Sequence, residues 1–277
     1  MSSTIHTSAS APTSAASGAS AASGAPLLHI DGLVKRFGGL TATDHADIRV
    51  QPGELHALIG PNGAGKTTLI HQISGALAPD AGRIVFRGDD ITRLPMPQRV
   101  LRGLARSYPI TSIFKRLSVR DKVALAVQAR QGSSLRFWQA ARSERARYAE
   151  AEQVVERVGL GPQMHALAGA LAHGEQRQLE GGLALATAPQ LLLLDEPMAG
   201  MGPDESERMV ALLLSLRGQT TVLLVEHDMD AVFRLADRIS VLVFGKVIAC
   251  GTPAEIRGNA DVRRAYLGDE ASEEVAA

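Results

Sequence analysis

The sequence predicts an α/β domain, on three observations. From residue 27 onward, short apolar runs alternate with amphipathic stretches, as strands alternate with helices in α/β proteins. A glycine-rich segment at 60–68 lies between an apolar run and a stretch of helical periodicity. A run of four leucines at 191–194 leads into an Asp-Glu pair, and the carboxyl ends of such buried strands are where α/β folds bind their ligands.

The elements follow in order from the apolar periodicity. Strands are expected at 27–30, 48–50, 55–59, 84–86, 191–194, 222–225, 239–244 and 247–249. Helices are expected at 66–77 (closed by Pro79), 97–104, 119–130, 142–158, 175–187, 205–216 and 229–236, with 132–134 as a break. A helical region therefore interrupts the α/β core, and no internal repeat is visible.

The two termini are expected to lie outside the folded domain. Residues 1–26 contain no Lys or Arg, and 16 of them are Ser or Ala, so they resemble a disordered tail and not a signal peptide. Residues 269–277 are expected to form a flexible acidic C-terminus. The single cysteine, Cys250, is interpreted as a small buried hydrophobe near the end of a strand and fits a reducing compartment.

Charge and hydropathy limit the partners. The chain carries 29 Lys and Arg against 29 Asp and Glu, and this balance argues against nucleic acid as a partner. No apolar stretch reaches the ~18–20 residues that a membrane-spanning helix needs. If the protein works at a membrane, something other than a span of its own must hold it there.

Residues 60–68 read GPNGAGKTT and satisfy the phosphate-loop pattern G-x-x-x-x-G-K-[ST]. All nine are candidate nucleotide ligands: Gly60, Pro61, Asn62, Gly63, Ala64, Gly65, Lys66, Thr67 and Thr68. The glycines let the backbone present N–H groups to phosphate oxygens, and the following helix adds the positive end of its dipole. Lys66, also a candidate catalytic residue, is expected to reach the β- and γ-phosphates of ATP, and Thr67 to ligate Mg²⁺.

The second motif, LLLLDEP at 191–197, supplies two carboxylates at a strand end. Asp195 is expected to hold Mg²⁺, directly or through water, and Glu196 to orient and polarise the attacking water. An apolar strand ending in Asp-Glu is common by itself. Its position about 130 residues after the phosphate loop favours the functional interpretation.

Two further segments complete the set. His227 follows another apolar strand, in LLVEHDMD; a lone His there is often structural, but a donor to the γ-phosphate fits the other motifs. LAHGEQRQLEGG at 171–182 places Gly174 before an amphipathic helix. Read alone, this segment predicts only the start of a helix.

In this order, the four motifs resemble those of the ABC-type ATPases. LAHGEQ stands where that family carries its signature sequence, about twenty residues before LLLLDEP. The resemblance covers about residues 27–268. It implies a P-loop NTPase core with an antiparallel β subdomain and a helical subdomain inserted at about 96–180.

The resemblance also implies roles for residues outside the phosphate loop. It implies a head-to-tail dimer in which the signature residues of one subunit close over the nucleotide of the other. Those residues are Ala172, His173, Gly174 and Glu175. Phe37, in VKRFGGL, aligns with the aromatic residue that stacks on adenine.

Within the family, several segments are similar to the ATPase subunit of branched-chain amino-acid importers: RFGGL, ITSIF, LAHGEQRQLE, AGMGPDE, EHDMD and RGNADVRRAYLG, together with the long helical insertion containing Trp138. This similarity implies two transmembrane permeases, a second ABC ATPase in a homo- or heterodimer, and, indirectly, a periplasmic or extracellular binding protein. It places the chain peripherally on the cytoplasmic face of the inner or plasma membrane.

The chain departs from the family pattern at three positions. Ala172 replaces the signature serine, and Gly202 stands where many members carry an aspartate. Pro109 replaces the glutamine expected to ligate Mg²⁺ and to sense the permease. Because proline has neither a side-chain carbonyl nor an N–H, we expect nucleotide binding to persist while Mg²⁺ positioning and coupling to transport change.

Other functions stay open at this point. The cargo could be urea, short amides or aromatic acids, or the chain could serve lipopolysaccharide export. A soluble ABC ATPase acting on DNA or the ribosome would usually carry long coiled coils or two ATPase domains, and this chain has one phosphate loop and no heptad run. A P-loop kinase would need a phosphoryl-acceptor site and has no use for LAHGEQ.

Overall fold

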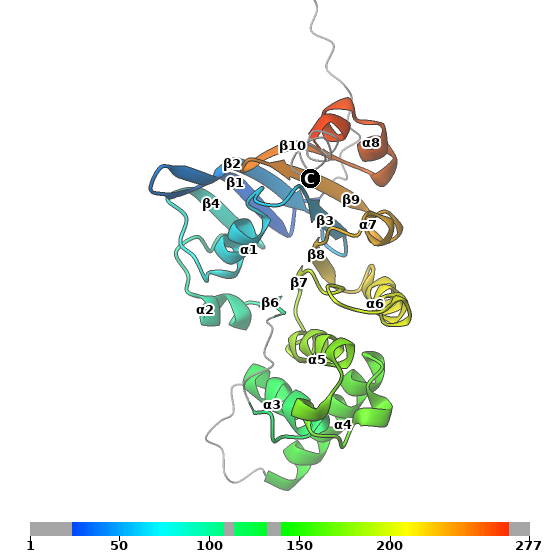
Figure 1. The fold of residues 1–277 in the computed structure, drawn as a ribbon. Coiled ribbons are helices and arrows are strands. Elements are labelled where there is room, and N and C mark those ends of the chain that lie inside the picture. The colour runs from blue at the N-terminus through cyan, green and yellow to red at the C-terminus, as the bar shows by residue number, and fades with distance from the viewer. Residues whose placement is uncertain (1–23, 108–113, 132–139, 266–277) are drawn as a thin grey trace, which may run out of the picture.

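The computed structural model describes residues 24–107, 114–131 and 140–265, which form two sheets and the helices around them (Figure 1). One sheet is antiparallel, with four strands in the order β2-β1-β4-β5. The other has six strands in the order β10-β9-β3-β8-β7-β6, parallel throughout except for β10. The predicted α/β class with an antiparallel β part and a helical part is confirmed.

The strands are β1 (Leu28–Phe37), β2 (Leu40–Val50), β3 (Leu55–Ile59), β4 (Ala81–Phe86), β5 (Asp89–Asp90), β6 (Leu104–Arg106), β7 (Leu191–Asp195), β8 (Thr221–Val225), β9 (Arg238–Val243) and β10 (Lys246–Gly251). The helices are α1 (Lys66–Ser74), α2 (Met96–Leu101), α3 (Val119–Gln131), α4 (Ala140–Arg157), α5 (His173–Leu185), α6 (Pro203–Leu216), α7 (Met229–Leu235) and α8 (Pro253–Gly258). Short 3-10 helices lie at Gly161–Gln163 and Ala168–Ala170.

The central strands are apolar on both faces because each face meets a different core. Leu191 and Leu193 of β7 pack with α1 and the antiparallel sheet. Leu192 and Leu194 face the other way, into the cluster that also contains residues of α3, α4, α5 and α6. Two-sided burial explains the unbroken leucine run and fixes the carboxyl end of β7 beside that of β8.

The helices α3, α4 and α5 form a separate lobe at the far end of the molecule from the antiparallel sheet (Figure 1). Within the predicted insertion at 96–180, β6 pairs in parallel with β7 and so belongs to the six-stranded sheet. The predicted helix at 97–104 is wrong at its end. Gly103 takes a left-handed φ of 93°, which stops α2, and Leu104 begins β6.

The structure corrects the prediction for Cys250, whose side chain is exposed. β10 is the edge strand of its sheet, and its residues alternate between exposed and partly buried positions. Cys250 takes one of the exposed positions in that alternation. A short apolar run does not by itself show which of the alternating residues face outward.

Arg99 of α2 fixes the C-terminal end of α1. Its side chain is buried, and its guanidinium donates hydrogen bonds to the carbonyls of Gln72 (2.8 Å), Ile73 (2.7 Å), Leu94 (2.8 Å) and Thr92 (2.9 Å). Burial lowers the pKa of Arg99 to about 10. The cation therefore donates to two carbonyls at the negative end of the helix dipole, of which that of Gln72 also accepts from the Gly75 N–H.

We expect Arg99→Met to lower the free energy of unfolding by about 3 kcal/mol, because buried carbonyls would be left without donors. Chemical denaturation measures this loss. Arg102→Met, a change at an exposed arginine of the same segment, serves as the control and should stay within about 0.5 kcal/mol of wild type. Equal stability of the two variants would contradict the role given to Arg99.

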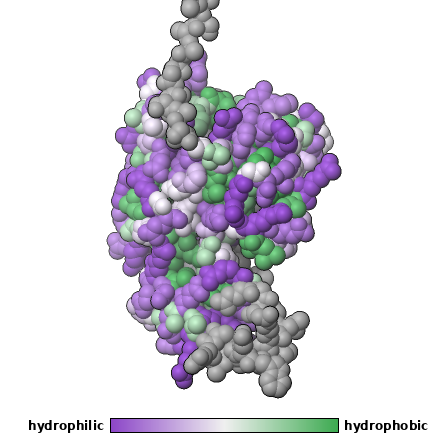
Figure 2. All heavy atoms as spheres, turned by 180° about the vertical axis from the view of Figure 1, so that it is seen from behind, coloured by the Kyte–Doolittle hydropathy of each residue, from purple (hydrophilic) through white to green (hydrophobic). Residues whose placement is uncertain are grey.

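The outer surface is mainly polar. Hydrophilic residues dominate the rear face of the molecule, and hydrophobic residues occur there in several separate patches (Figure 2). Among the described residues, no helix combines the length and the apolar character needed to cross a membrane.

Candidate functional site

The phosphate loop joins β3 to α1 and needs glycine at two points of close backbone contact. Gly60 has a φ of 157°, and a Cβ there would lie 2.0 Å from the carbonyl oxygen of Leu242. Gly65 has a φ of 101°, and its Cβ would lie 2.1 Å from the carbonyl oxygen of Ala42. Any side chain at either position would push the loop away from β9 or β2, so the glycines set the loop against both sheets.

Lys66 opens α1 and turns back over the loop. Its Nζ donates hydrogen bonds to the carbonyl oxygens of Gly60 (2.7 Å) and Pro61 (2.9 Å), and the residue is only 8% exposed. Burial lowers the pKa of Lys66, while the nearby carboxylates of Glu196 and Asp195 oppose that shift. The ammonium is thus held inside the loop where an anionic ligand would bind, with both carboxylates in electrostatic range.

The end of β7 carries Asp195 and Glu196. The carboxylate of Asp195 pairs with the guanidinium of Arg106 on β6, at 2.9 Å. Glu196 has a φ of 49°, a left-handed conformation that is uncommon for residues other than glycine, and its N–H donates to the carbonyl of Val225. Such conformations concentrate at functional sites. Here the turn directs the chain away from the sheet immediately after Asp195.

Glu226 and His227 follow β8, beside β7. The Glu226 side chain is 1% exposed, and its two oxygens accept hydrogen bonds from the backbone N–H groups of Met198 (2.9 Å) and His227 (3.2 Å). Burial raises the pKa of Glu226, and the two backbone hydrogen bonds oppose the shift. Its carboxylate therefore ties the loop that follows Glu196 to the backbone of His227, whose side chain is 64% exposed.

One pocket of about 420 Å³ brings the predicted elements together. It is lined by Asn62 to Thr68 of the phosphate loop, Glu196, Phe37, Leu40, Thr41, Ala42 and Phe244. Phe37, at the end of β1, is half exposed. The phosphate loop, the candidate base and the candidate adenine-stacking residue therefore line one pocket, although these three segments are far apart in the sequence.

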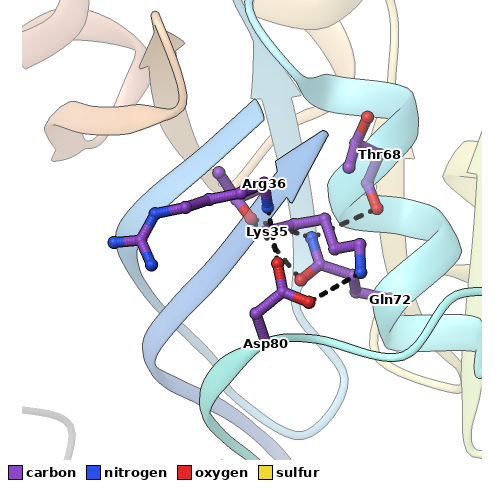
Figure 3. Close-up of polar contacts among 6 residues, drawn as sticks. Lys35, Arg36, Thr68, Gln72 and Asp80 are labelled. Carbon is purple, nitrogen blue, oxygen red and sulfur yellow. Dashed lines mark hydrogen bonds and ion pairs between the residues drawn. The ribbon is translucent and has the colours of Figure 1, made fainter. Parts of the chain in front are cut away.

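Asp80 holds the last residues of β1 before Phe37, through contacts with Lys35 and Arg36 (Figure 3). Asp80 accepts hydrogen bonds from the Lys35 ammonium (2.8 Å) and the backbone N–H of Arg36 (2.7 Å), and these hold the pKa of its carboxyl below the ordinary value. The Lys35 ammonium lies 5.6 Å from the centre of the Phe37 ring. The end of β1 is thus fixed immediately before the aromatic residue.

The signature residues lie elsewhere. Ala172 caps α5, and its N–H donates to the Glu175 carboxylate at 2.9 Å. Gly174 lies so close to Glu205 that a Cβ would come within 2.2 Å of its carboxyl carbon, and a Cβ on Gly200 would lie 3.2 Å from the His173 ring. The N-terminus of α5 therefore packs on the segment following β7, and its residues do not line the pocket around the phosphate loop.

Two residues that contact predicted site residues, Arg106 and Glu226, are not among those predicted from the sequence. Arg106 ends a short apolar run, and Glu226 directly precedes His227, so both stand at strand ends. A charged residue at the end of an apolar strand is the sequence signal by which both could have been identified. Pro109 and Trp138 lie outside the described residues.

Comparison with known proteins places these motifs in one family. The family model described as "ABC transporter" matches residues 43–199. A second model, "Branched-chain amino acid ATP-binding cassette transporter", matches residues 246–272.

Alignments with related proteins cover nearly the whole domain. The high-affinity branched-chain amino acid transport ATP-binding protein LivG of Escherichia coli (strain K12) is 38% identical over 252 residues, covering 88% of this chain and 98% of LivG. The protein of the same description in Pseudomonas aeruginosa, BraF, is 38% identical over 251 residues, with the same shares covered. The lipopolysaccharide export system ATP-binding protein LptB of Haemophilus influenzae is 31% identical over 245 residues, again covering 88% and 98%.

Solved structures agree with the fold. The ADP conformation of an ATP-binding cassette of an ABC transporter matches with a TM-score of 0.77 and 30% identity, covering 88% of this chain and 99% of that one. A nucleotide-free ATP-binding cassette matches with a TM-score of 0.76 and 28% identity, covering 87% and 98%.

Proposed function

Since the chain belongs to the ABC transporter family as an ATP-hydrolysing subunit, we propose that it drives the uptake of branched-chain amino acids through partner permeases. Two observations support this cargo. The relatives LivG and BraF carry that description at 38% identity over 88% of the chain, and the C-terminal match at 246–272 is to the branched-chain amino-acid group. LptB, at 31% identity, supports the export alternative less well.

The pocket supports a mechanism in which the phosphate loop holds the triphosphate of ATP and Glu196 prepares the water. Lys66 exchanges the carbonyls of Gly60 and Pro61 for phosphate oxygens, which are stronger acceptors because they are charged. Glu196 accepts a proton from, or orients, the water that attacks the γ-phosphate in line. His227, whose exposed side chain follows the neighbouring strand, donates to the same phosphate.

The residues present fit a magnesium ion. Thr67 is exposed and offers a hydroxyl oxygen, Asp195 offers a carboxylate, and Mg²⁺ binds through oxygen ligands. When bound with ATP, the ion would neutralise charge on the transferring phosphoryl group. Arg106 pairs with Oδ2 of the Asp195 carboxylate at 2.9 Å, so the guanidinium and the ion would have to share it.

The working unit that we propose is a head-to-tail dimer of two ATPase subunits. Lys66, Glu196 and Phe37 share one pocket, while the backbone N–H groups at the start of α5 lie outside it. A helix N-terminus favours phosphate binding, so residues 172–175 of a second subunit can supply the missing side. Gly200 and Glu205 brace that helix end from behind.

The permease contact that we propose is an apolar groove between the core and the helical lobe. Its volume is about 390 Å³, and its walls come from α2, β6, α3 and α5. Val100 and Leu125 line it and are 37% and 44% exposed. A short apolar segment of a permease seated there would place the chain peripherally on the cytoplasmic face of the membrane, with a binding protein delivering the cargo on the other side.

Transport assays in the source organism test the proposed cargo. Deletion of the gene should abolish high-affinity uptake of labelled leucine, isoleucine and valine. The wild-type gene should restore uptake, and the Lys66→Ala gene should not. Unchanged uptake of these amino acids, together with a loss of urea, amide or aromatic-acid uptake or a defect in lipopolysaccharide export, would replace the proposed cargo.

Leu125→Glu tests the groove. We expect the variant to lose at least about tenfold in permease association, because a charged carboxylate would replace an apolar contact in the groove. Co-purification with the permeases and leucine uptake report this loss. Leu214→Glu on α6, at a leucine that is 41% exposed and does not line the groove, is the matched control; equal loss in both variants would argue against the groove.

A further inference from the structure

Phe244, in the turn between β9 and β10, belongs to none of the four sequence motifs. It is 84% exposed, yet it lines the same pocket as the phosphate loop. Two other large apolar side chains line that pocket while remaining well exposed, Phe37 at 50% and Leu40 at 67%. Exposed apolar side chains that line a pocket together indicate a ligand with an apolar face.

The backbone of this turn is fixed to the phosphate loop. The N–H of Gly245 donates to the carbonyl of Ala64, and the N–H of Asp44 donates to the carbonyl of Gly245, both at 2.9 Å. A Cβ on Gly245 would lie 2.9 Å from the carbonyl oxygen of Ala42. The turn therefore cannot shift without moving either the loop or β2, and the backbone of Phe244 stays beside the pocket.

The conformation of Phe244 is unfavourable for a phenylalanine. Its φ is 47°, in the left-handed region that glycine and asparagine adopt readily and bulky residues avoid. Since the side chain is exposed, core burial does not offset this strain. Strained residues of this kind concentrate at ligand sites.

We propose that Phe244 is a second aromatic contact for the adenosine of ATP, covering the nucleoside from the β9–β10 turn while Phe37 contacts the base from the end of β1. The inference rests on the proposed nucleotide pose, in which the triphosphate occupies the phosphate loop and the base lies toward Phe37. An aromatic ring stacks on a base or covers a ribose without reading a specific hydrogen-bond pattern. Phe244 thus adds affinity for the nucleoside and none for the phosphates.

The test compares ATP with inorganic tripolyphosphate, which lacks the nucleoside. For Phe244→Asn in the isolated full-length chain, we expect the dissociation constant and the KM of ATP to rise about fivefold or more. Tripolyphosphate affinity and kcat at saturating ATP should be unchanged. The melting temperature without nucleotide should be equal or higher, because asparagine relieves the strained turn.

Arg87→Asn is the matched control. Arg87 also has a left-handed φ, 57°, and is exposed, but it does not line the nucleotide pocket. It should gain the same relief of strain and leave ATP affinity unchanged. A similar loss in both variants would overturn the proposal.

Three other results would overturn it. ATP affinity could be unchanged in Phe244→Asn, or ATP and tripolyphosphate affinity could fall together, which would mean that the turn acts through the phosphate loop. The loss could also appear only at protein concentrations at which the chain dimerises, which would assign Phe244 to the partner subunit. Phe37→Ala separates this inference from the proposed pose: loss of ATP affinity there alone rejects only the role of Phe244, whereas no loss in either variant rejects the pose.

Discussion

Glu196→Gln should bind ATP as the wild type does and hydrolyse it about 10²–10⁴ times more slowly, the range expected for loss of a general base. Glutamine keeps the shape of the side chain but cannot accept a proton from water. The backbone supports this expectation, since the left-handed turn at Glu196 and its hydrogen bond to Val225 place residue 196 in the pocket without help from the carboxylate. Steady-state hydrolysis and equilibrium ATP binding measure the two effects separately.

The control for Glu196→Gln is Glu207→Gln on α6, which removes a carboxylate paired with Arg234 on the surface. Exposed pairs of this kind contribute little to stability, so kcat and ATP affinity should both stay at wild-type values. A Glu196→Gln variant with near-normal kcat would show that another group activates the water. The mechanism would then pass to His227 or to a residue of the second subunit.

Much of the fold could be predicted because the buried strands are short, mostly apolar runs that are easy to recognise in the sequence. β3, β7 and β8 are buried on both faces and mostly apolar, with His56 as a buried polar exception in β3, and turn residues bound them, so their positions follow from composition. β2 was seen only at its last residues, because its first part is half exposed and alternates irregularly. β6 was mistaken for the end of a helix, since three residues carry no period that separates strand from helix.

Those parts of the candidate site could be predicted whose residues lie close together in the sequence, at the spacing that their chemistry requires. The phosphate loop and the pair Asp195–Glu196 are local motifs, and the structure brings Glu196 into the pocket of the loop. Arg106 could not be assigned, since its pairing with Asp195 depends on β6 lying beside β7. Phe244 could not be assigned either, because its position depends on backbone hydrogen bonds from the β9–β10 turn to two distant segments.

Lys66→Ala should lower ATP affinity by about 10²–10³-fold, because two charge-assisted hydrogen bonds to phosphate would be lost from a largely buried position. The side chain is held inside the loop, with Nζ 2.7 Å from the Gly60 carbonyl oxygen and 2.9 Å from that of Pro61. A side chain held in this way would bind phosphate oxygens with little new ordering. Isothermal titration and the rise in melting temperature with ATP both measure the loss.

The thermal measurement also separates binding from folding in Lys66→Ala. A ligand at 100 times its dissociation constant stabilises a protein by about 2.7 kcal/mol, and a hundredfold loss of affinity reduces this to about 0.4 kcal/mol at the same ATP concentration. The melting temperature without ATP should change little, since only two loop carbonyls lose a donor. Lys115→Ala, at an exposed lysine, should keep the full ATP-dependent rise. If Lys66→Ala also kept the full ATP-dependent rise, the backbone N–H groups of residues 60–65 and the dipole of α1 would have to hold the triphosphate alone. The ammonium would then act only in the transition state. A lower kcat at unchanged ATP affinity would show this.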